Sequence, residues 1–484
     1  RDNVIGEYST GIHIASSNQL HITGNKVGVW DNASNSSFPC GTGIYLISTQ
    51  GELLQNAISQ NSLSQLQVTY GQNLLVESNT IGSTYFLAAG SGISTNQSIG
   101  FTLRYNTIQN NKGYGIDLAL STQFTLDSNF ILRNTAGGIR FSQTTDSSVV
   151  NNTIHSNGEN DQAEPYNEDG ILLENSSGNG FTGNRIGLYL GANEGHGIHL
   201  IDSSNNTIGG YVPTDGNIIG NNYKSGIFIE GTGSRDNEIG GNFIGYDNSV
   251  APVYQIQPNG NHGISLYYLT ESNTIGAVGI FAAPNVIASN SWSGIAIVQS
   301  NHNHISDNYI GTDTNGKALG NGGHGVNIVD GNNNTINSNT VAYNGKSNSR
   351  QGVAVDGLVS YGNSVSQNSI YQNGGAPIVL LNGANSSILP PTLSRTDNTL
   401  SGTTCANCTV EFFSGSNGSD IRFYEAAVQA NGAGGYSYQL SKHVRGKFIR
   451  ATATDLTAGT SQISDAVFGY NFPWTLFNVN FRKR

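Results

Sequence analysis

The tetrapeptides Gly115-Ile-Asp-Leu118 and Gly138-Ile-Arg-Phe141 belong to an element that recurs through most of the chain. Each copy has Gly, then Ile or Val, then a variable residue, then an aliphatic or aromatic residue or Thr. Twelve copies lie between Gly11 and Gly352, at a mean spacing of about 31 residues. Self-similarity at such a period is the signature of a repeat architecture, in which each copy adds one unit to a stack.

A second recurring element is Asn-x-Ile-Gly, as in Asn79-Thr-Ile-Gly82 and Asn184-Arg-Ile-Gly187. In both elements apolar and polar residues alternate over four or five positions, which is the period of a half-buried strand. No stretch has the periodicity of a helix, so short parallel strands can be joined only by winding the chain into a solenoid. The sequence therefore predicts an all-β parallel β-helix of about twelve coils, with differences in spacing taken up by loops. We expect one inward column of isoleucines and ladders of Asn side chains at the turns; the column comprises Ile12, Ile44, Ile116, Ile139, Ile171 and Ile198.

The repeat stops after Leu389-Pro-Pro391. Six or seven alternating segments with Gly and Asn turns follow, which is typical of a small antiparallel β-sandwich. We expect three regions: a β-helix over 1–389, a sandwich over 390–470 that covers the end of the β-helix, and a tail over 471–484. The tail is apolar and strand-like, and it ends in Arg482-Lys-Arg484.

Composition excludes several classes of function. Charged residues make up 11% of the chain and the net charge is −11, which argues against phosphate and nucleic-acid binding. No run approaches the ~18 apolar residues of a membrane-spanning helix. Few charges, abundant Asn, Ser, Thr, Gly and Tyr, and only three cysteines favour a protein outside the cell or on its surface.

Two stretches resemble known families. The segment from Asn308 to Ile328, which begins Asn308-Tyr-Ile-Gly-Thr-Asp-Thr-Asn-Gly316, resembles the repeats of secreted right-handed parallel β-helix proteins of the pectate-lyase-like superfold. The segment Thr403-Thr-Cys-Ala-Asn-Cys-Thr-Val-Glu-Phe-Phe413 resembles immunoglobulin-like modules attached to prokaryotic surface proteins. The resemblance implies a right-handed β-helix followed by an immunoglobulin-like sandwich. It is compatible with many functions, because this superfold serves pectate lyases, polygalacturonases, epimerases, tailspikes and adhesins.

Candidate catalytic residues lie just past three successive copies of the repeat: Glu174, Asp202 and Glu230, with His199 beside them. Glu174 and Glu230, two coils apart, would lie about 9–10 Å from each other, near the carboxylate spacing of inverting glycosidases. The alternative is a solvated acidic edge at a turn. On the neighbouring outward positions, Asp117 and Arg140 are expected to form an ion pair, and the histidines of His196-Gly197 and His324-Gly325 are expected to fill turns on the surface.

Metal and cysteine chemistry have weaker signals. Asp31, Asp247 and Asp313 lie in comparable loops that partly resemble a calcium loop, but the alternating ligands and closing Glu of such a loop are missing. Ordinary turn chemistry explains them better, so no cofactor is expected and calcium is the alternative. Cys405 and Cys408 are too few for a zinc site, and we expect a local disulfide with Cys40 left unpaired.

The sequence favours an extracellular structural protein that assembles with copies of itself into a surface layer, sheath or filament. The motif Asn3-Val-Ile-Gly6 is already in repeat register, so we expect an uncovered first coil that the apolar tail of another copy could extend. The assembly residues would be Trp474, Leu476, Phe477, Val479 and Phe481. The alternative function is a polysaccharide-active enzyme, either a glycoside hydrolase or a lyase, or a glycan-binding adhesin on the same fold.

Overall fold

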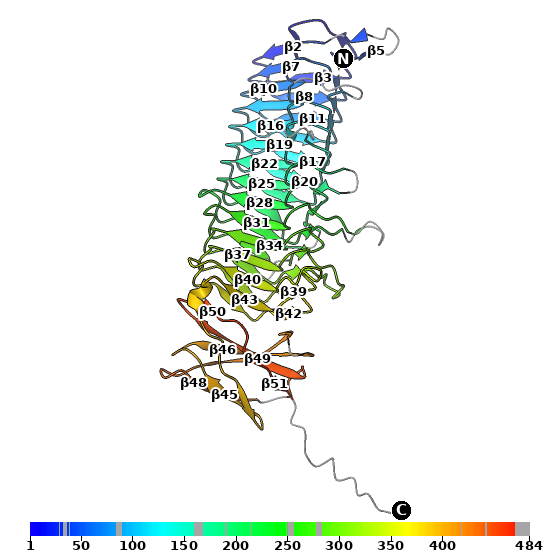
Figure 1. The fold of residues 1–484 in the computed structure, drawn as a ribbon. Coiled ribbons are helices and arrows are strands. Elements are labelled where there is room, and N and C mark those ends of the chain that lie inside the picture. The colour runs from blue at the N-terminus through cyan, green and yellow to red at the C-terminus, as the bar shows by residue number, and fades with distance from the viewer. Residues whose placement is uncertain are drawn as a thin grey trace, which may run out of the picture.

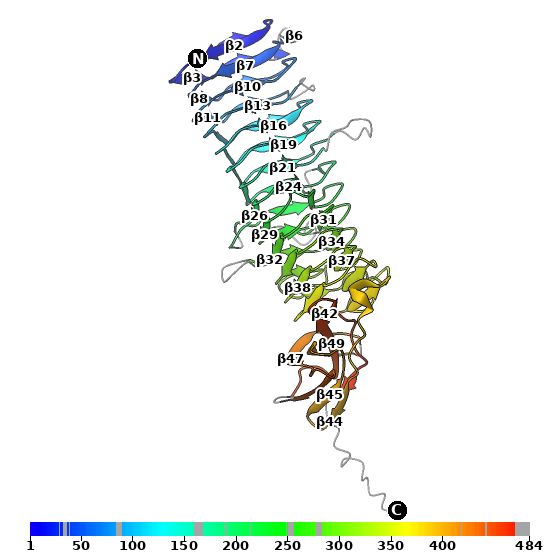
Figure 2. The same ribbon diagram turned by 90° about the vertical axis from the view of Figure 1, so that its left-hand side faces the viewer.

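The computed structural model describes residues 1–28, 39–83, 90–158, 168–188, 191–212, 214–247, 256–276, 283–417, 419–440 and 443–469, together with Ser249 and the two strands of a hairpin within 30–37. These residues form a rod of stacked coils with a small β-domain at its C-terminal end (Figures 1 and 2). Among them, no helix is long and apolar enough to span a membrane.

Three parallel sheets run along the rod, and each coil contributes one strand to each sheet in the order A, B, C, except that the last coil has no strand in sheet C among the described residues. Sheet A contains β1 (Val4–Ile5), β4 (Lys26–Val27), β9 (Ala57–Ile58), β12 (Thr80–Ile81), β15 (Thr107–Gln109), β18 (Phe130–Leu132), β21 (Thr153–His155), β24 (Arg185–Gly187), β27 (Ile218–Gly220), β30 (Phe243–Ile244), β33 (Val286–Ile287), β36 (Tyr309–Ile310), β39 (Thr340–Ala342) and β42 (Ser369–Tyr371). Sheet B contains β2 (Thr10–Ala15), β7 (Thr42–Ile47), β10 (Leu66–Thr69), β13 (Ile93–Asn96), β16 (Tyr114–Ala119), β19 (Gly137–Ser142), β22 (Ile171–Glu174), β25 (Ile198–Ile201), β28 (Ile227–Glu230), β31 (Ile264–Tyr267), β34 (Ile295–Val298), β37 (Val326–Val329), β40 (Val353–Asp356) and β43 (Ile378–Leu381). Sheet C contains β3 (Leu20–Thr23), β8 (Gly51–Leu54), β11 (Leu74–Glu77), β14 (Thr102–Arg104), β17 (Thr125–Asp127), β20 (Ser148–Val150), β23 (Gly180–Thr182), β26 (Thr207–Gly209), β29 (Glu238–Gly240), β32 (Thr274–Gly276), β35 (His304–Ser306), β38 (Thr335–Asn337) and β41 (Ser364–Ser366).

The inward isoleucine column is confirmed. In sheet B the register pairs Ile12 with Ile44, Ile116 with Ile139, and Ile171 with Ile198. From Ile44 onward these side chains have no exposed surface. Complete burial of an aliphatic side chain stabilises the fold by about 1.5–3 kcal/mol, so the repeated column supplies much of the driving force for coiling.

The glycine that opens each repeat is required by the close approach of successive coils. A Cβ atom at Gly115 would lie 2.8 Å from the carbonyl oxygen of Gly138, and one at Gly197 would lie 2.6 Å from that of Gly226. Contacts this short force neighbouring atoms to move, which explains why glycine opens most coils of sheet B; the coil of β10 is an exception, with Gln65 at this position. The Gly-Ile pattern therefore marks where the chain enters sheet B.

Buried Asn side chains connect neighbouring coils in ladders, as expected. Asn106 is typical: its Nδ2 donates to the carbonyl oxygen of Val76 at 2.8 Å and to Oδ1 of Asn129 at 3.0 Å. The backbone N–H of Asn106 donates to the same Oδ1 at 3.0 Å. A buried amide is costly unless it is hydrogen-bonded, and the ladders meet that condition at most turns; Asn111 Oδ1 has no partner among the described residues.

The number of coils differs from the prediction. Sheet B has fourteen strands among the described residues, not about twelve, because β10 and β43 lack the Gly-Ile signature. The 49-residue interval between Gly43 and Gly92, assigned to a loop from the sequence, contains the whole coil that begins at β10. There Gln65 takes the place of the glycine, and its side-chain Oε1 accepts the hydrogen bond of Asn61 Nδ2 at 2.8 Å.

The C-terminal domain is antiparallel. One sheet contains β44 (Ser394–Thr396), β45 (Thr399–Thr403) and β48 (Gly435–Gln439). The other contains β46 (Thr409–Gly415), β47 (Phe423–Gln429), β49 (Phe448–Asp455), β50 (Gly459–Thr460) and β51 (Val467–Phe468). The remaining described elements are the hairpin of β5 (Trp30–Asp31) and β6 (Ser36–Ser37) and a short 3₁₀ segment, Ala384–Ser387.

This domain supplies hydrogen-bond acceptors to the last coil of the β-helix. The N–H of Val365 donates to Thr460 Oγ1, and the N–H of Gln372 donates to Asp420 Oδ1. Glu411, which is buried, accepts from the hydroxyl of Ser366, and burial raises the pKa of its carboxyl. These contacts pair backbone groups that an open end of the solenoid would leave unpaired. The division of the chain at residues 389 and 470 remains a prediction.

Candidate functional site

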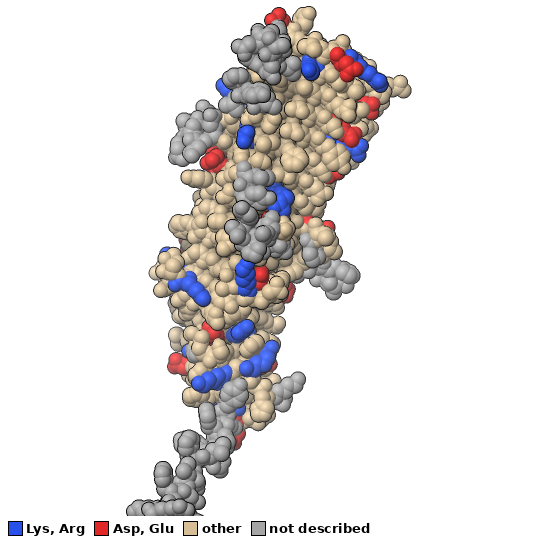
Figure 3. All heavy atoms as spheres, turned by 90° about the vertical axis from the view of Figure 1, so that its right-hand side faces the viewer, with Lys and Arg blue, Asp and Glu red and all other residues tan. Residues whose placement is uncertain are grey.

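Charged side chains gather on the outer face of sheet B, where five successive coils each contribute one. We call these five residues the charged strip: Asp117 on β16, Arg140 on β19, Glu174 on β22, His199 on β25 and Glu230 on β28. The sign of the charge alternates from coil to coil when His199 is protonated. Sheet C carries a second row on its outer face, with one charged or titratable side chain on each of five successive coils: His21, Glu52, Glu77, Arg104 and Asp127. On the face in Figure 3 charges are scattered over a mostly uncharged surface.

Arg140 joins the first three members of the strip. Its Nε donates to Glu174 Oε2 at 2.8 Å, and its Nη1 lies 3.7 Å from Asp117 Oδ1. The expected ion pair between Asp117 and Arg140 is therefore present. All three side chains are partly exposed, at 22–33%, so they can contact a molecule that lies on the sheet.

The carboxyl of Asp117 is the most enclosed by its neighbours in the first half of the strip, with a side chain that is 22% exposed. Burial raises the pKa of its carboxyl, Arg140 opposes the shift, and the charge of Glu174 adds to it. The ring of Tyr114 lies 5.6 Å from the Arg140 guanidinium and packs against buried Leu172. A carboxyl with a raised pKa beside a cation is the kind of group that can donate a proton to a ligand.

His199 is held between two carboxylates at the other end of the strip. Its Nδ1 lies 2.8 Å from Asp169 Oδ2, and its Nε2 lies 3.1 Å from Glu230 Oε1. The ring is only 5% exposed, whereas the Glu230 side chain is 25% exposed. Burial disfavours the charged ring, but Asp169 and Glu230 outweigh it and raise the pKa of His199 to about 9. His199 is therefore an imidazolium at neutral pH, and it holds Glu230 in place at the surface.

His196 lies beside this cluster and is neutral. Its ring stacks on Phe228 with a centroid distance of 4.5 Å, and its Nδ1 accepts the N–H of Ser225. Burial holds the pKa of His196 well below its usual range. The expectation of a surface histidine at this turn is wrong, because the side chain is buried.

Asp169, His196 and His199 lie close enough together to suggest a metal site. Their hydrogen bonds argue against one. Nδ1 of His196 accepts a backbone N–H, both ring nitrogens of His199 contact carboxylates, and both oxygens of Asp169 receive protein donors. A cation would have to displace these donors, so the cluster fits an imidazolium and not a metal ion.

The predicted catalytic residues are thus only partly brought together. His199 contacts Glu230, whereas Glu174 contacts Arg140 instead. Asp202 is separate, because the register pairs Glu174 with Ile201 and Ile201 with Glu230. Asp202 lies one position further on, at the corner, where its Oδ1 accepts the N–H of Gly233.

Sequence reasoning missed Asp169 and the bridging role of Arg140. The signal for Asp169 was its position: it precedes Gly170 as His196 precedes Gly197 on the next coil, and the N–H of His196 donates to its Oδ1 at 2.6 Å.

Of the three Asp residues predicted as calcium ligands, Asp247 and Asp313 have described side chains, and both already accept hydrogen bonds from protein donors. Asp247 is fully buried, and its Oδ2 accepts from Arg185 Nη2 at 2.7 Å. Asp313 Oδ1 accepts two backbone N–H groups, from Asn315 and Lys317, as in ordinary turn chemistry. The side chain of Asp31 lies outside the described residues.

The structure joins Cys405 and Cys408 in a disulfide and leaves Cys40 buried and free. The five assembly residues of the tail, from Trp474 to Phe481, lie outside the described residues.

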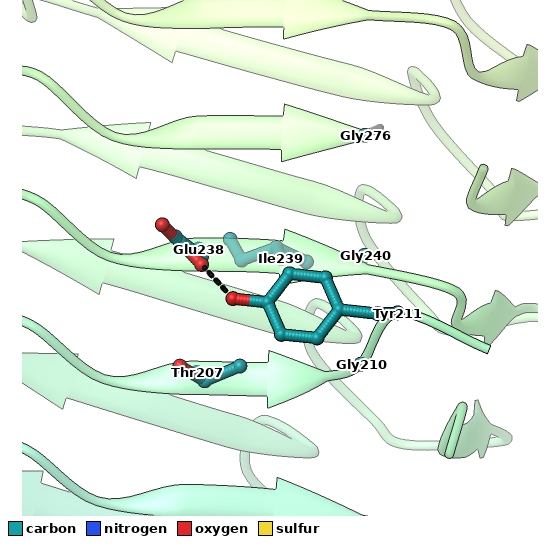
Figure 4. A pocket seen from close by; sticks show the side chains of 7 residues that line it. All are labelled: Thr207, Gly210, Tyr211, Glu238, Ile239, Gly240 and Gly276. Atoms are coloured by element: carbon teal, nitrogen blue, oxygen red, sulfur yellow. Dashed lines mark hydrogen bonds between the residues drawn. The ribbon is translucent and has the colours of Figure 1, made fainter. Parts of the chain in front are cut away.

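A small pocket on the outer face of sheet C is a different feature. The ring of Tyr211 lies between β26 and β29 and its hydroxyl donates to Glu238 Oε2 at 3.1 Å (Figure 4). The space beneath it is about 10 Å³, which is room for one water molecule. This pocket is too small to hold a substrate.

A sequence model described as the right-handed β-helix region matches residues 10–186 and, in a second overlapping match, residues 91–276. Together these matches span more than half of the chain. The chain belongs to the right-handed β-helix family. No curated protein sequence matches the β-helix chain.

Several solved structures are similar to this β-helix. The A-module of the mannuronan C-5 epimerase AlgE4 from Azotobacter vinelandii is 13% identical, with a TM-score of 0.40 over 71% of this chain and 86% of that one. The Dettilon tailspike protein is 14% identical, with a TM-score of 0.42 over 89% of this chain and 85% of that one. A DFA-IIIase from Arthrobacter chlorophenolicus A6 is 12% identical, with a TM-score of 0.33 over 70% and 74%. These neighbours are named as an epimerase, a tailspike and a DFA-IIIase, and at this level the similarity concerns the fold alone.

Proposed function

We propose that this protein binds an extracellular polysaccharide along the outer face of sheet B. The observation that carries the proposal is the charged strip: Asp117, Arg140, Glu174 and Glu230 are partly exposed on the outer face, and the buried His199 holds Glu230 in place, in a chain of which only 11% is charged. Spaced at about 4.8 Å per coil, the strip extends about 19 Å along the rod. A row of charged donors and acceptors with this periodicity suits an extended polymer that runs parallel to the rod.

Aromatic side chains lie at both ends of the strip. Tyr114 lies against Arg140 at one end, and Phe228 and Tyr267 form an edge-to-face pair at the other, with Tyr268 beside them. Tyr268 is exposed. Aromatic rings with an apolar face and a polar edge suit sugars, whose rings also have apolar faces and polar rims.

The charges of the strip indicate which polysaccharides it prefers. Its three carboxylates outnumber Arg140 and protonated His199, and buried Asp169 adds a further negative charge behind His199. The chain as a whole carries a net charge of −11. An acidic polymer would be repelled, so the proposed ligand is a neutral polysaccharide or one with amino groups.

Binding assays on immobilised polysaccharides test this function. The probes are xylan and dextran as neutral polymers, chitosan as a cationic polymer and polygalacturonate as an acidic one. The variant Arg140→Gln/Glu174→Gln/Glu230→Gln should bind its best polymer at least tenfold more weakly. The matched control is Arg104→Gln/Glu77→Gln, which removes an ion pair of the same type, 3.1 Å long, from sheet C. Equal losses in both variants, or no binding to any neutral or cationic polymer, would contradict the proposal.

A second candidate function is cleavage of the bound polysaccharide. Asp117 and Glu174 both contact one guanidinium group, at 3.7 and 2.8 Å, which sets an upper limit of about 9 Å on the separation of their carboxylates. This limit is compatible with the spacing of about 6.5–9.5 Å in inverting glycosidases. The raised pKa of Asp117 makes it the proton donor of the pair, and Glu174 is the base that would activate water. In a reducing-end assay Asp117→Asn and Glu174→Gln should each lower the rate by about 10²–10⁴. A rate that both variants retain would exclude this pair.

Self-assembly is a separate proposal that glycan binding does not require. It rests on the apolar tail, and deletion of residues 472–484 should then convert polymers into monomers by light scattering. A monodisperse intact protein would exclude it.

A further inference from the structure

A second polar surface lies closer to the N-terminal end of the rod, away from the charged strip. It is an open cavity of about 570 Å³ at the corner where β2, β7 and β10 of sheet B turn toward β3, β8 and β11 of sheet C. Its lining includes Asn18, Ser48, Thr49, Gln50, Tyr70 and Gln72. Cavities of about 300–1,000 Å³ are the usual size for binding a small organic ligand.

The backbone N–H and carbonyl groups at this corner already form hydrogen bonds between neighbouring coils. The N–H of Gln50 donates to the carbonyl oxygen of Ser17, and the N–H of Gln72 donates to that of Thr49, both between neighbouring coils. The side chains, in contrast, form no hydrogen bond with the described residues. Thr49 is buried and its Oγ1 has no partner among them.

The same corner further along the rod is different. There Thr122 Oγ1 lies 3.1 Å from Thr145 Oγ1, and Ser177 Oγ lies 3.1 Å from Ser204 Oγ, so the hydroxyl groups satisfy one another from coil to coil. Hydroxyl groups that are paired in this way have fewer donors and acceptors left for hydrogen bonds to a ligand. Thr270, at the same corner further along, also has a buried Oγ1 without a partner among the described residues. The cavity is therefore the part of this corner where several amide and hydroxyl groups together are left for an external partner.

We propose that this cavity binds a neutral saccharide. Its hydroxyl and amide groups can both donate and accept hydrogen bonds, as the hydroxyl groups of a sugar require, and no Asp, Glu, Lys, Arg or His is among its lining residues. The ring of Tyr70 is 51% exposed and offers an aromatic face at one side of the cavity. Tyr70 has a φ of 55°, the left-handed conformation that turns the chain at this corner.

The cavity and the charged strip use different coils. The cavity is formed by the coils of β2, β7 and β10, and the strip begins at β16, with the coil of β13 between them. The saccharide site therefore does not depend on the function proposed for the strip, and variants of one surface leave the other intact.

Saturation-transfer difference NMR on the full chain tests the site directly. The probes are maltohexaose, cellohexaose, xylohexaose and mannohexaose, with trigalacturonate as a charged comparison. At least one neutral oligosaccharide should bind saturably, and Tyr70→Ala and Gln72→Ala should each weaken its affinity about tenfold. Ser48→Trp, which fills the cavity, should abolish the signal.

Tyr105→Ala is the matched control, because Tyr105 is also an exposed corner tyrosine with a φ of 55° but lies outside the cavity. Unchanged melting temperatures and circular dichroism spectra would show that the variants fold. The proposal is overturned if no neutral oligosaccharide binds at millimolar concentration, or if Ser48→Trp binds as well as the unmodified chain. The Arg140→Gln/Glu174→Gln variant should retain this binding, and a loss there would assign the signal to the charged strip instead.

Discussion

Histidines of the same β-helix carry opposite charge states. On the outer face of sheet B, His199 lies between Asp169 and Glu230, and its pKa is raised to about 9. Further along the rod, burial lowers the pKa of His262 and of His324 to about 4.

The difference comes from what the neighbouring coil supplies. Nδ1 of His262 accepts the N–H of Ser293, and Nδ1 of His324 accepts the N–H of Gln351, both at 3.1 Å. A histidine that accepts a backbone N–H is neutral and links coils as the Asn ladders do, whereas a histidine between carboxylates is charged. The comparison separates the candidate functional surface from the structural ladder, and the two kinds of histidine occupy different positions of the repeat. His199 follows Gly197-Ile198, whereas His262 and His324 directly precede Gly263 and Gly325.

The largest effect is expected where the charged histidine loses its partner. Asp169→Ala removes the fully buried carboxylate that contacts both His199 and the N–H of His196. Breaking a buried pair in this way should lower the free energy of unfolding by about 3–5 kcal/mol in urea denaturation. Asp202→Ala is the control, because Asp202 is exposed and accepts one N–H, and it should cost less than about 1 kcal/mol. Equal costs would show that the His199 cluster is not a special feature of the fold.

The neutral histidines should make the protein sensitive to acid. A histidine whose pKa is lowered by folding binds protons more strongly in the unfolded chain, so stability falls as pH decreases from about 6.5 toward 4. At pH 4 the loss should be about 2–3 kcal/mol for each of His262 and His324. The variant His262→Asn/His324→Asn keeps an acceptor near Nδ1 but does not titrate. Its stability should decline less steeply over this range, and a slope equal to that of the unmodified chain would contradict the assignment.

The charged histidine should act in the opposite direction. Because the pKa of His199 is raised by folding, its contribution is fully present below about pH 6.5 and is lost as pH rises through 9. The free energy of unfolding should decrease by about 2 kcal/mol between pH 6.5 and 9. In His199→Gln this part of the decrease should disappear. If the variant and the unmodified chain fall in parallel, His199 is not an imidazolium.

The smallest effect concerns calcium. Asp247 is paired with Arg185 and Asp313 receives two backbone donors, so neither should bind the ion. Addition of calcium, or of a chelator, should change the melting temperature by less than about 1 °C. A rise of several degrees in melting temperature with calcium would contradict this prediction and indicate that the loop of Asp313 binds the ion.

The period of the sequence repeat predicted the fold. The prediction was wrong for the coil of β10, which does not carry the repeat motif. Gly115 and Gly138 mark their coils because a Cβ atom would clash with the next coil, whereas Gln65 enters sheet B without this mark and its coil was taken for a loop. The site was harder to predict. A shift of one residue separates Asp202 from Glu230, and the contact between Asp169 and His199 spans 30 residues, so only the register of neighbouring coils reveals either.

The most direct test of the account is the histidine spectrum of the protein with its polysaccharide. The chain has 10 histidines, so selective ¹⁵N labelling of histidine should give resolvable ring signals. When the polymer that binds best in the immobilised assay is added, the signals of His199 should move, because the ligand contacts Glu230 and Glu230 contacts His199. The signals of His262 and His324 should stay unchanged. Binding that shifts His262 or His324 and leaves His199 unaltered would place the ligand elsewhere and contradict the proposed function.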